Sequence, residues 1–164
     1  MEHKTTLQKL GKITLLHKLY FNKAAENKDI YLGQLPIIHY IMSNDGCTQK
    51  DLVSFFKVSA PSIATSVKRL MKSGYVNRLT DESDSRVNRL HATKKAHDIS
   101  TAMKKECEAI DEMAFRDFSE NELLEFERLI NKILDSLNTE EFKTKNIHEL
   151  ISEEKKIHKK GGLG

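Results

Sequence analysis

Apolar residues recur every three to four positions along most of this chain, which is the spacing of amphipathic helices. The first such stretch covers residues 5–25, where Leu7, Leu10, Ile13 and Tyr20 share one stripe. The same spacing predicts further helices over residues 35–42, 48–56, 59–72, 93–117 and 119–138. The pattern therefore favours a mainly helical protein.

Polar residues stand where these expected helices begin. Thr48, Ser59, Thr93 and Ser119 each precede an apolar-periodic stretch, and their hydroxyls suit the N-cap position. Glu122 follows Ser119 by three residues, which is the spacing of a capping box. These caps mark the helix boundaries more sharply than periodicity alone.

The period changes from that of a helix to that of a strand after residue 74. Residues 75–79 and 87–91 alternate between apolar and polar side chains, and the turn-rich segment 81–85 separates them. This arrangement predicts one small antiparallel hairpin in an otherwise helical chain.

Length and composition limit the number of domains and the cellular location that the chain can have. The 164 residues suffice for about one domain. No apolar run approaches the roughly 18–20 residues that span a bilayer, and the N-terminus has no signal-peptide core. Cys47 and Cys107 provide neither a disulfide framework nor a CxxC motif. We therefore expect a cytoplasmic protein with no membrane partner.

The sequence contains no motif for catalysis or metal binding. It has no GxSxG, no glycine-rich phosphate loop and no HExxH. Its seven histidines form no HxxxH or HxxE pair on an expected helix. We therefore predict that the chain is not an enzyme and has no cofactor and no metal site.

Charge is distributed unevenly, although the net charge of the chain is only +3. Residues 59–95 carry eight Lys or Arg against three acids, whereas residues 96–138 carry five against eleven. A basic surface attracts phosphates and an acidic surface repels them, so this polarity would orient the protein on a DNA duplex. The alternative is that both charge blocks only solvate helices.

The stretch from 48 to 96 carries a set of residues at characteristic spacings. Thr48-Gln49 opens one helix, Ser59 opens the next, and Leu70 and Gly74 close it; Asp81-x-x-Asp84-x-Arg86 and Leu90-x-x-Thr93-x-Lys95 follow. Over residues 7–137 the chain resembles the MarR family of bacterial transcription regulators. The resemblance implies a winged helix-turn-helix fold, a homodimer, and binding of double-stranded DNA at short inverted repeats near promoters.

The resemblance also implies a division of the chain. Residues 30–92 would form the winged helix-turn-helix DNA-binding domain, and residues 1–29 and 93–138 the helical dimerisation domain. Residues 139–164 would form a polar tail that ends in Gly-Gly-Leu-Gly. Apolar residues from 147 to 157 give this tail the pattern of a weak amphipathic helix.

The candidate DNA contacts follow from the same resemblance. On the recognition helix they are Ser59, Ser62, Thr65, Ser66, Lys68, Arg69 and Lys72. On the wing they are Arg78, Arg86, Asn88 and Arg89, with Asp84 orienting Arg86. For Arg69, pairing with an acid inside the domain is an equal alternative. Many members have a basic residue where this chain has Thr65, so bidentate reading of guanine is expected to be weaker.

The helices outside 30–92 expose more apolar surface than a small wing domain could cover. The residues best buried against a second copy are Leu7, Leu10, Ile13, Leu123, Ile130, Leu134 and Leu137. MarR-like proteins often bind a small ligand between the helical and wing domains. The residues whose positions suggest such a cleft are His17, Tyr20, Phe21, His39, Tyr40 and Met42, for which plain core packing is the alternative.

The sequence thus favours a dimeric repressor that binds a pseudo-palindromic promoter site and is released by a small ligand. One alternative is a winged-helix module that binds a protein instead of specific DNA. Another is a thiol-based redox sensor that uses Cys47, because this residue stands just before an expected helix N-terminus. Cys107 lies on an apolar stripe and is expected to be core.

Overall fold

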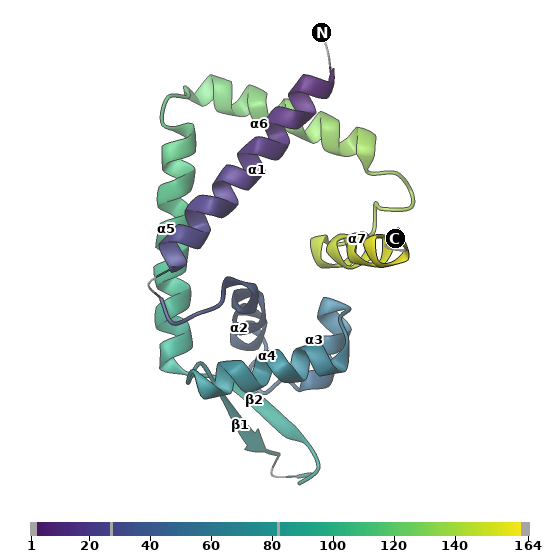
Figure 1. Cartoon of the computed structure of the whole chain (residues 1–164). Helices are drawn as coiled ribbons and strands as arrows, with labels where there is room; N and C mark the ends of the chain where they lie inside the picture. The colour runs from purple at the N-terminus through teal and green to yellow at the C-terminus, as the bar shows by residue number, and fades with distance from the viewer. Residues whose placement is uncertain (1–2, 27, 82, 162–164) are drawn as a thin grey trace. The chain divides into compact units, whose positions relative to one another are not determined.

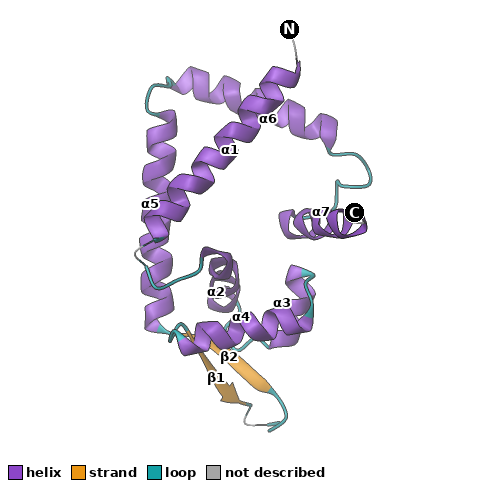
Figure 2. Ribbon diagram, viewed as in Figure 1, coloured by secondary structure: helices purple, strands orange, loops and turns teal. Residues whose placement is uncertain are grey.

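The computed structural model is mainly helical and describes residues 3–26, 28–81 and 83–161 (Figures 1 and 2). The helices are α1 (His3–Ala25), η1 (Leu32–Gln34), α2 (Leu35–Ser43), α3 (Gln49–Phe56), α4 (Ala60–Lys72), α5 (Lys94–Phe115), α6 (Glu120–Leu137) and α7 (Ile147–Gly161). The strands are β1 (Val76–Thr80) and β2 (Asn88–Ala92). The predicted fold class, mainly α with one β-hairpin wing, is confirmed. None of the described helices combines the length and apolarity needed to cross a membrane.

The chain forms two compact units. The first comprises Met1–Thr48 with Thr65–Arg116, and the second comprises Gln49–Ala64 with Asp117–Gly164. Helix α4 continues without a break from the second unit into the first. The predicted division into a DNA-binding and a dimerisation domain concerns the function of the parts and stays a prediction.

Three of the predicted helix caps are seen among the described hydrogen bonds, the first being Ser59, whose hydroxyl accepts from the Ser62 backbone N–H at the start of α4. The Thr93 side chain accepts a hydrogen bond from the Ala96 backbone N–H at the start of α5. At α6, Ser119 and Glu122 form both halves of a capping box. Helix α7 continues to Gly161, beyond the amphipathic pattern of residues 147–157. Residues 162–164, the last of the glycine-rich end, lie outside the described residues.

The core of the first unit lies where α2, α4 and the hairpin supply apolar side chains. Ile38, Ile41, Leu70 and Leu90 are fully buried there. A second cluster joins Ala25, Leu35 and Met103, with Phe21 and Ile99 packed against it. It ties α1, α2 and α5 of the first unit together.

The hairpin is fastened along both edges of β2. Strand β2 pairs with β1 in antiparallel register, and Arg78 lies opposite Leu90. On its other edge, the Leu90 N–H donates to the Cys47 carbonyl at 2.9 Å, and the Gly46 N–H donates to the Leu90 carbonyl at 3.0 Å. Gly46 has φ +76°, a conformation that favours glycine. The turn after α2 thus serves as a short third strand.

A polar cluster joins the base of the hairpin to the start of α5. The Tyr75 hydroxyl donates to the Asp29 carbonyl at 2.7 Å, and the Lys95 ammonium lies 4.5 Å from the Tyr75 ring centre. The same ammonium binds the Asp29 carboxylate and the Ser73 carbonyl. The Thr93 hydroxyl donates to the Gly74 carbonyl. Thr93 and Lys95 of the Leu-x-x-Thr-x-Lys pattern therefore have structural partners.

The second unit holds α3, the first residues of α4, α6 and α7. The imidazole of His148 on α7 packs edge-on against Phe56 of α3, with ring centres 5.0 Å apart. The Ser152 hydroxyl donates to the carbonyl of Lys57, which has φ +51° in the turn between α3 and α4. The C-terminal helix is thereby packed on the helix-turn-helix.

Several apolar residues of the helices are not buried in the single chain, among them Cys107, which was expected to be core. Met71 and Cys107 are only partly buried, and Ala114 is exposed. No described residue of α6 is buried, and Leu134 and Leu137 are 55% and 64% exposed. Periodicity identifies the apolar face of a helix but not the surface that covers it.

The two leucines of the hairpin provide a matched test of this packing. Leu90→Ala should lower the free energy of unfolding by about 2–5 kcal/mol, because it leaves a cavity in a fully buried site. Leu79→Ala, on the facing strand but 58% exposed, should cost less than about 1 kcal/mol. Urea denaturation followed by circular dichroism measures both values, and equal losses would contradict the packing described here.

Candidate nucleic-acid interface

Helix α4 is amphipathic, and its two faces differ sharply. Ile63, Val67 and Leu70 are buried on one face. The candidate contacts Ser62, Thr65, Lys68, Arg69 and Lys72 are exposed, whereas Ser66 is partly buried. Small hydroxyls therefore lie along the N-terminal half of the helix and cations along its C-terminal half. Such a face suits a groove of DNA with phosphates at its edge.

The first turn of the helix is arranged by Ser59, which is exposed just before it. The Ser59 hydroxyl lies 2.8 Å from the Ser62 hydroxyl and 3.4 Å from the Ser62 backbone nitrogen. Pro61 occupies the first turn without loss, because its missing N–H would have no partner inside the helix. Two hydroxyls are thus held side by side at the start of α4.

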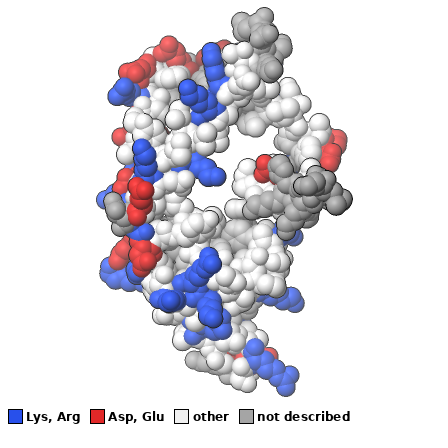
Figure 3. Space-filling model, viewed as in Figure 1, with Lys and Arg blue, Asp and Glu red and all other residues white. Residues whose placement is uncertain are grey.

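All candidate cations of α4 and the wing except Arg89 have no ion-pair partner among the described residues. Lys68, Arg69, Lys72, Arg78 and Arg86 are exposed, and no ion pair of the described residues includes them. The internal ion pair considered for Arg69 is therefore not among the described contacts. Figure 3 shows blue side chains gathered over the C-terminal part of α4 and again at the tip of the hairpin, with red side chains along α5.

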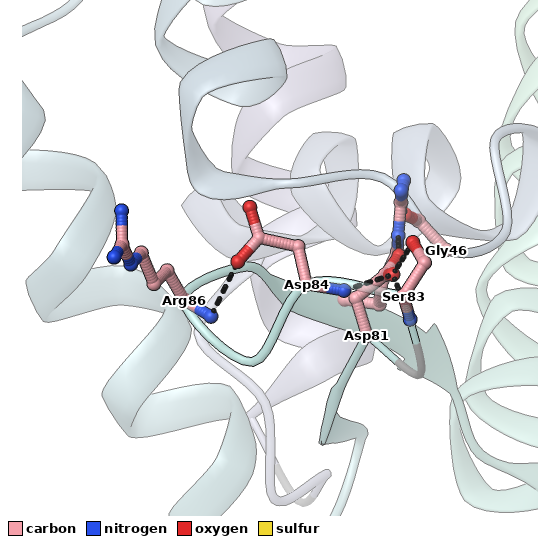
Figure 4. A network of polar contacts seen from close by, with 6 residues as sticks. Gly46, Asp81, Ser83, Asp84 and Arg86 are labelled. Carbon is pink, nitrogen blue, oxygen red and sulfur yellow. Dashed lines mark hydrogen bonds and ion pairs between the residues drawn. The ribbon is translucent and has the colours of Figure 1, made fainter.

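The wing loop is organised around the Asp81 carboxylate (Figure 4). One of its oxygens accepts hydrogen bonds from the backbone N–H groups of Ser83 and Asp84 at 2.9 and 3.1 Å. The other accepts from Arg89 Nε at 2.6 Å. Hydrogen bonds from Ser83, and then from Arg89, hold the pKa of the Asp81 carboxyl well below its usual range. The loop is therefore built around a permanent negative charge.

The backbone of Arg86 is held in place within this loop, while its side chain extends out of it. The Asp84 carboxylate accepts a hydrogen bond from the Arg86 backbone N–H at 3.0 Å. In Figure 4 the Arg86 guanidinium points away from the Asp84 carboxylate. Asp84 thus positions the main chain of Arg86 and leaves its charge available.

Arg89 is in a different situation. Besides its bond to Asp81, its guanidinium donates to the Gly46 carbonyl at 3.2 Å. The side chain joins the wing loop to the turn after α2. The pattern pointed to Arg89 as a DNA contact and gave no indication of this bracing, because Gly46 and Asp81 are far apart in the sequence.

Asn88 and Arg78 lie on the paired strands with exposed side chains. Asn88 faces Thr80 at the end of the ladder next to the wing loop, and Arg78 faces Leu90 in its middle. Because the ladder is antiparallel and pinned along β2, both positions are set by the strand register.

The residues proposed to line an effector cleft have several environments. His17 on α1 bonds to Asp111 on α5, and Phe21 packs against the cluster around Met103. The His39 imidazole lies 3.0 Å from the Ser100 hydroxyl. Tyr20 is 47% exposed, and Tyr40 and Met42 are partly buried. A role in effector binding stays a prediction for all six residues.

Cys47, the candidate redox thiol, is only 8% exposed and its backbone pairs with Leu90. Oxidant-sensing thiols are accessible to the oxidant and have a depressed pKa. Burial therefore does not favour the redox alternative.

Comparison with known proteins agrees with this geometry. The sequence profile described as MarR family matches residues 29–87. The chain is 24% identical over 127 residues to YybA of Bacillus subtilis, an uncharacterized HTH-type transcriptional regulator, covering 77% of this chain and 85% of YybA. It is 25% identical over 118 residues to the HTH-type transcriptional regulator BilQ of Clostridioides difficile, covering 72% and 80% of the two chains.

Solved structures show the same fold. The crystal structure of MarR aligns with a TM-score of 0.62 at 25% identity, covering 84% of this chain and 94% of MarR. A mutant of S. aureus MepR bound to an oligodeoxyribonucleotide aligns with a TM-score of 0.65 at 20% identity, covering 84% and 99%.

The helix-turn-helix, the hairpin and the basic surface define a winged helix-turn-helix transcriptional regulator. Over residues 29–87 the chain matches the MarR family model, and over most of its length it is similar to HTH-type transcriptional regulators. The relatives are regulators, which confirms the prediction that the chain is not an enzyme.

Removing the Asp81 carboxylate tests the organisation of the wing loop. In Asp81→Ala the backbone amides of Ser83 and Asp84 should exchange with solvent roughly tenfold faster, because they lose their acceptor. Hydrogen exchange followed by NMR measures this. Ser85→Ala, a change in the same loop, should leave both rates unaltered. Unchanged rates in Asp81→Ala would show that Asp81 does not order the loop.

Proposed function

We propose that the protein is a homodimeric repressor that binds a pseudo-palindromic DNA site near a promoter in the cytoplasm. The observation that carries this proposal is the exposed face of α4, where hydroxyls and unpaired cations stand opposite a buried apolar stripe. In a structural relative, a MepR mutant, the protein is bound to an oligodeoxyribonucleotide. That relative supports the class of ligand, while the residues of α4 define the contacts.

We assign base contact to the N-terminal part of α4 and phosphate contact to its C-terminal part. Ser59, Ser62 and Thr65 are short and able both to donate and to accept hydrogen bonds, so they tolerate several base edges. Lys68, Arg69 and Lys72 would bind phosphates, with Arg78 and Asn88 adding to these from the wing. Most of the affinity then comes from charge, and base specificity is modest.

Arg86 is the proposed minor-groove contact. Its backbone is held by Asp84 and the loop is held by Asp81, so binding DNA orders little besides one side chain. A narrow A·T-rich minor groove has a strongly negative potential that attracts a guanidinium. Arg89 stabilises this loop through its bonds to Asp81 and to the Gly46 carbonyl.

Dimerisation is supported by uncovered apolar surface. Leu7 and Ile13 on α1 are each 56% exposed, and Leu134 and Leu137 on α6 are more than half exposed. Large apolar patches on a single chain mark interaction surfaces. A two-fold dimer would place two recognition helices about 34–36 Å apart, which matches one turn of DNA.

We also propose that a small ligand releases the protein from DNA. This part of the proposal is supported by the family resemblance and by the aromatic and imidazole side chains of α1 and α2 described above.

Arg86→Ala should weaken binding to a duplex selected from genomic DNA by at least about tenfold, since a groove-inserted side chain is lost. Its thermal unfolding should be unchanged, because only the Arg86 backbone contacts the protein among the described residues. Lys104→Ala removes an exposed cation from α5 and is the matched control. Fluorescence anisotropy measures the affinity.

The same titrations at several salt concentrations separate DNA binding from protein binding. The logarithm of the affinity should fall linearly with the logarithm of salt, with a slope of about −0.9 per phosphate contact. A flat salt response would exclude the proposed phosphate contacts, and parent-like affinity of Arg86→Ala would refute the wing assignment.

Leu134→Glu should convert the dimer to a monomer, because it places a charge in the proposed interface. Lys132→Glu changes charge on the same helix, about 200° away around its axis, and should leave the dimer intact. Sedimentation velocity distinguishes the two states. A monomeric parent protein, or a Leu134→Glu variant that is still dimeric, would contradict this interface.

A further inference from the structure

Two helices of the first unit bring three different metal-ligating side chains to one point. His17 lies on α1, and Cys107 and Asp111 lie one turn apart on α5. The imidazole Nε2 is 3.1 Å from one Asp111 carboxylate oxygen, and the Cys107 sulfur is 3.9 Å from the other. One ligand atom from each residue lies within 4.8 Å of the other two.

We propose that His17, Cys107 and Asp111 bind a divalent cation of the zinc class, with water as the fourth ligand. Nitrogen, thiolate and carboxylate together are a donor set that Zn²⁺ accepts and that Mg²⁺ or Ca²⁺ does not prefer. This site is separate from the surfaces assigned to DNA and does not depend on the proposed function.

The distances fit tetrahedral coordination after small side-chain adjustments. With metal–ligand bonds of about 2.0–2.3 Å, two ligand atoms of a tetrahedron lie about 3.3–3.6 Å apart. The nitrogen–oxygen and sulfur–oxygen separations here, 3.1 and 3.9 Å, lie on either side of that range. The two separations are measured to different oxygens of the Asp111 carboxylate, and one ligand atom from each residue lies within 4.8 Å of the others, so the atoms would have to approach one another by up to about 1 Å.

Exposure of the site leaves room for the ion and for water. The side chains of His17 and Asp111 are 43% and 53% exposed, so a hydrated cation can reach them. Closed four-ligand zinc sites are structural, whereas open sites have three protein ligands and a water in the fourth position. The three ligands here correspond to an open site.

The alternative is that His17 and Asp111 form only a hydrogen bond and that the thiol is a bystander. A cysteine binds a metal ion as the thiolate, so metal binding displaces the thiol proton, whereas a hydrogen bond to Asp111 keeps it. A thiolate–metal bond is thus the property that distinguishes a metal site from a hydrogen bond.

Cobalt is the probe, because a Co²⁺–thiolate bond gives a charge-transfer absorption band in the near ultraviolet. Titration of the purified, reduced full chain with Co²⁺ should produce this band with a stoichiometry of one per chain, and Zn²⁺ should abolish it by displacement. Zn²⁺ should also raise the temperature of unfolding, since the ion joins α1 to α5 only in the folded state.

Variants assign the band to its ligands. Cys107→Ser should abolish the band and the thermal shift, and His17→Gln or Asp111→Asn should each weaken Co²⁺ binding at least about tenfold. Cys47→Ala, which removes the other thiol, and His39→Gln, which removes an imidazole outside the cluster, should retain both. Circular dichroism verifies that each variant is folded.

Three outcomes would overturn the proposal. The first is a parent chain that gives no Co²⁺–thiolate band. The second is a band that persists in folded Cys107→Ser. The third is a band lost in folded Cys47→Ala, which would assign the thiolate to the other cysteine. DNA affinity does not enter any of these measurements, so the metal site can fail while the proposed function stands.

Discussion

The position of Leu90 is the constraint on which the rest of the wing depends. A two-stranded hairpin is marginally stable by itself. Here its second strand has a fully buried leucine at the centre and backbone hydrogen bonds on both edges, to β1 and to the turn at Gly46 and Cys47. The wing loop, its aspartates and Arg86 keep a defined direction only because this strand cannot slide or tilt.

Two kinds of electrostatic arrangement lie close together in this wing. Asp81 and Arg89 form an ion pair with each other and hydrogen bonds with the backbone, and these contacts fix the conformation of the loop. The Arg86 guanidinium points away from the Asp84 carboxylate (Figure 4) and takes part in no ion pair of the described residues. The sequence alone presents both arginines as equivalent cations near one loop. Their different roles arise from which of them can reach Asp81 and the Gly46 carbonyl.

Local features of the fold were predictable from the sequence, and long-range ones were not. Helix caps at Thr93 and Ser119, the hairpin and the exposed face of α4 each depend on residues a few positions apart. The contact of His17 with Asp111 spans 94 positions, and no spacing rule relates a residue on one helix to a pair on another. Burial of the α6 leucines against a second copy stays a prediction for a related reason, since a helix face does not reveal what covers it.

Strand β2 ends at Ala92 and helix α5 begins at Lys94, so Thr93 is the whole connection between them. Its hydroxyl is bonded both to the first turn of α5 and to the Gly74 carbonyl before β1. A connection of one residue, hydrogen-bonded on both sides, prevents β2 and α5 from rotating independently. The hairpin and α5 therefore move as one rigid element, and a rotation of α5 about its axis displaces the tip of the wing.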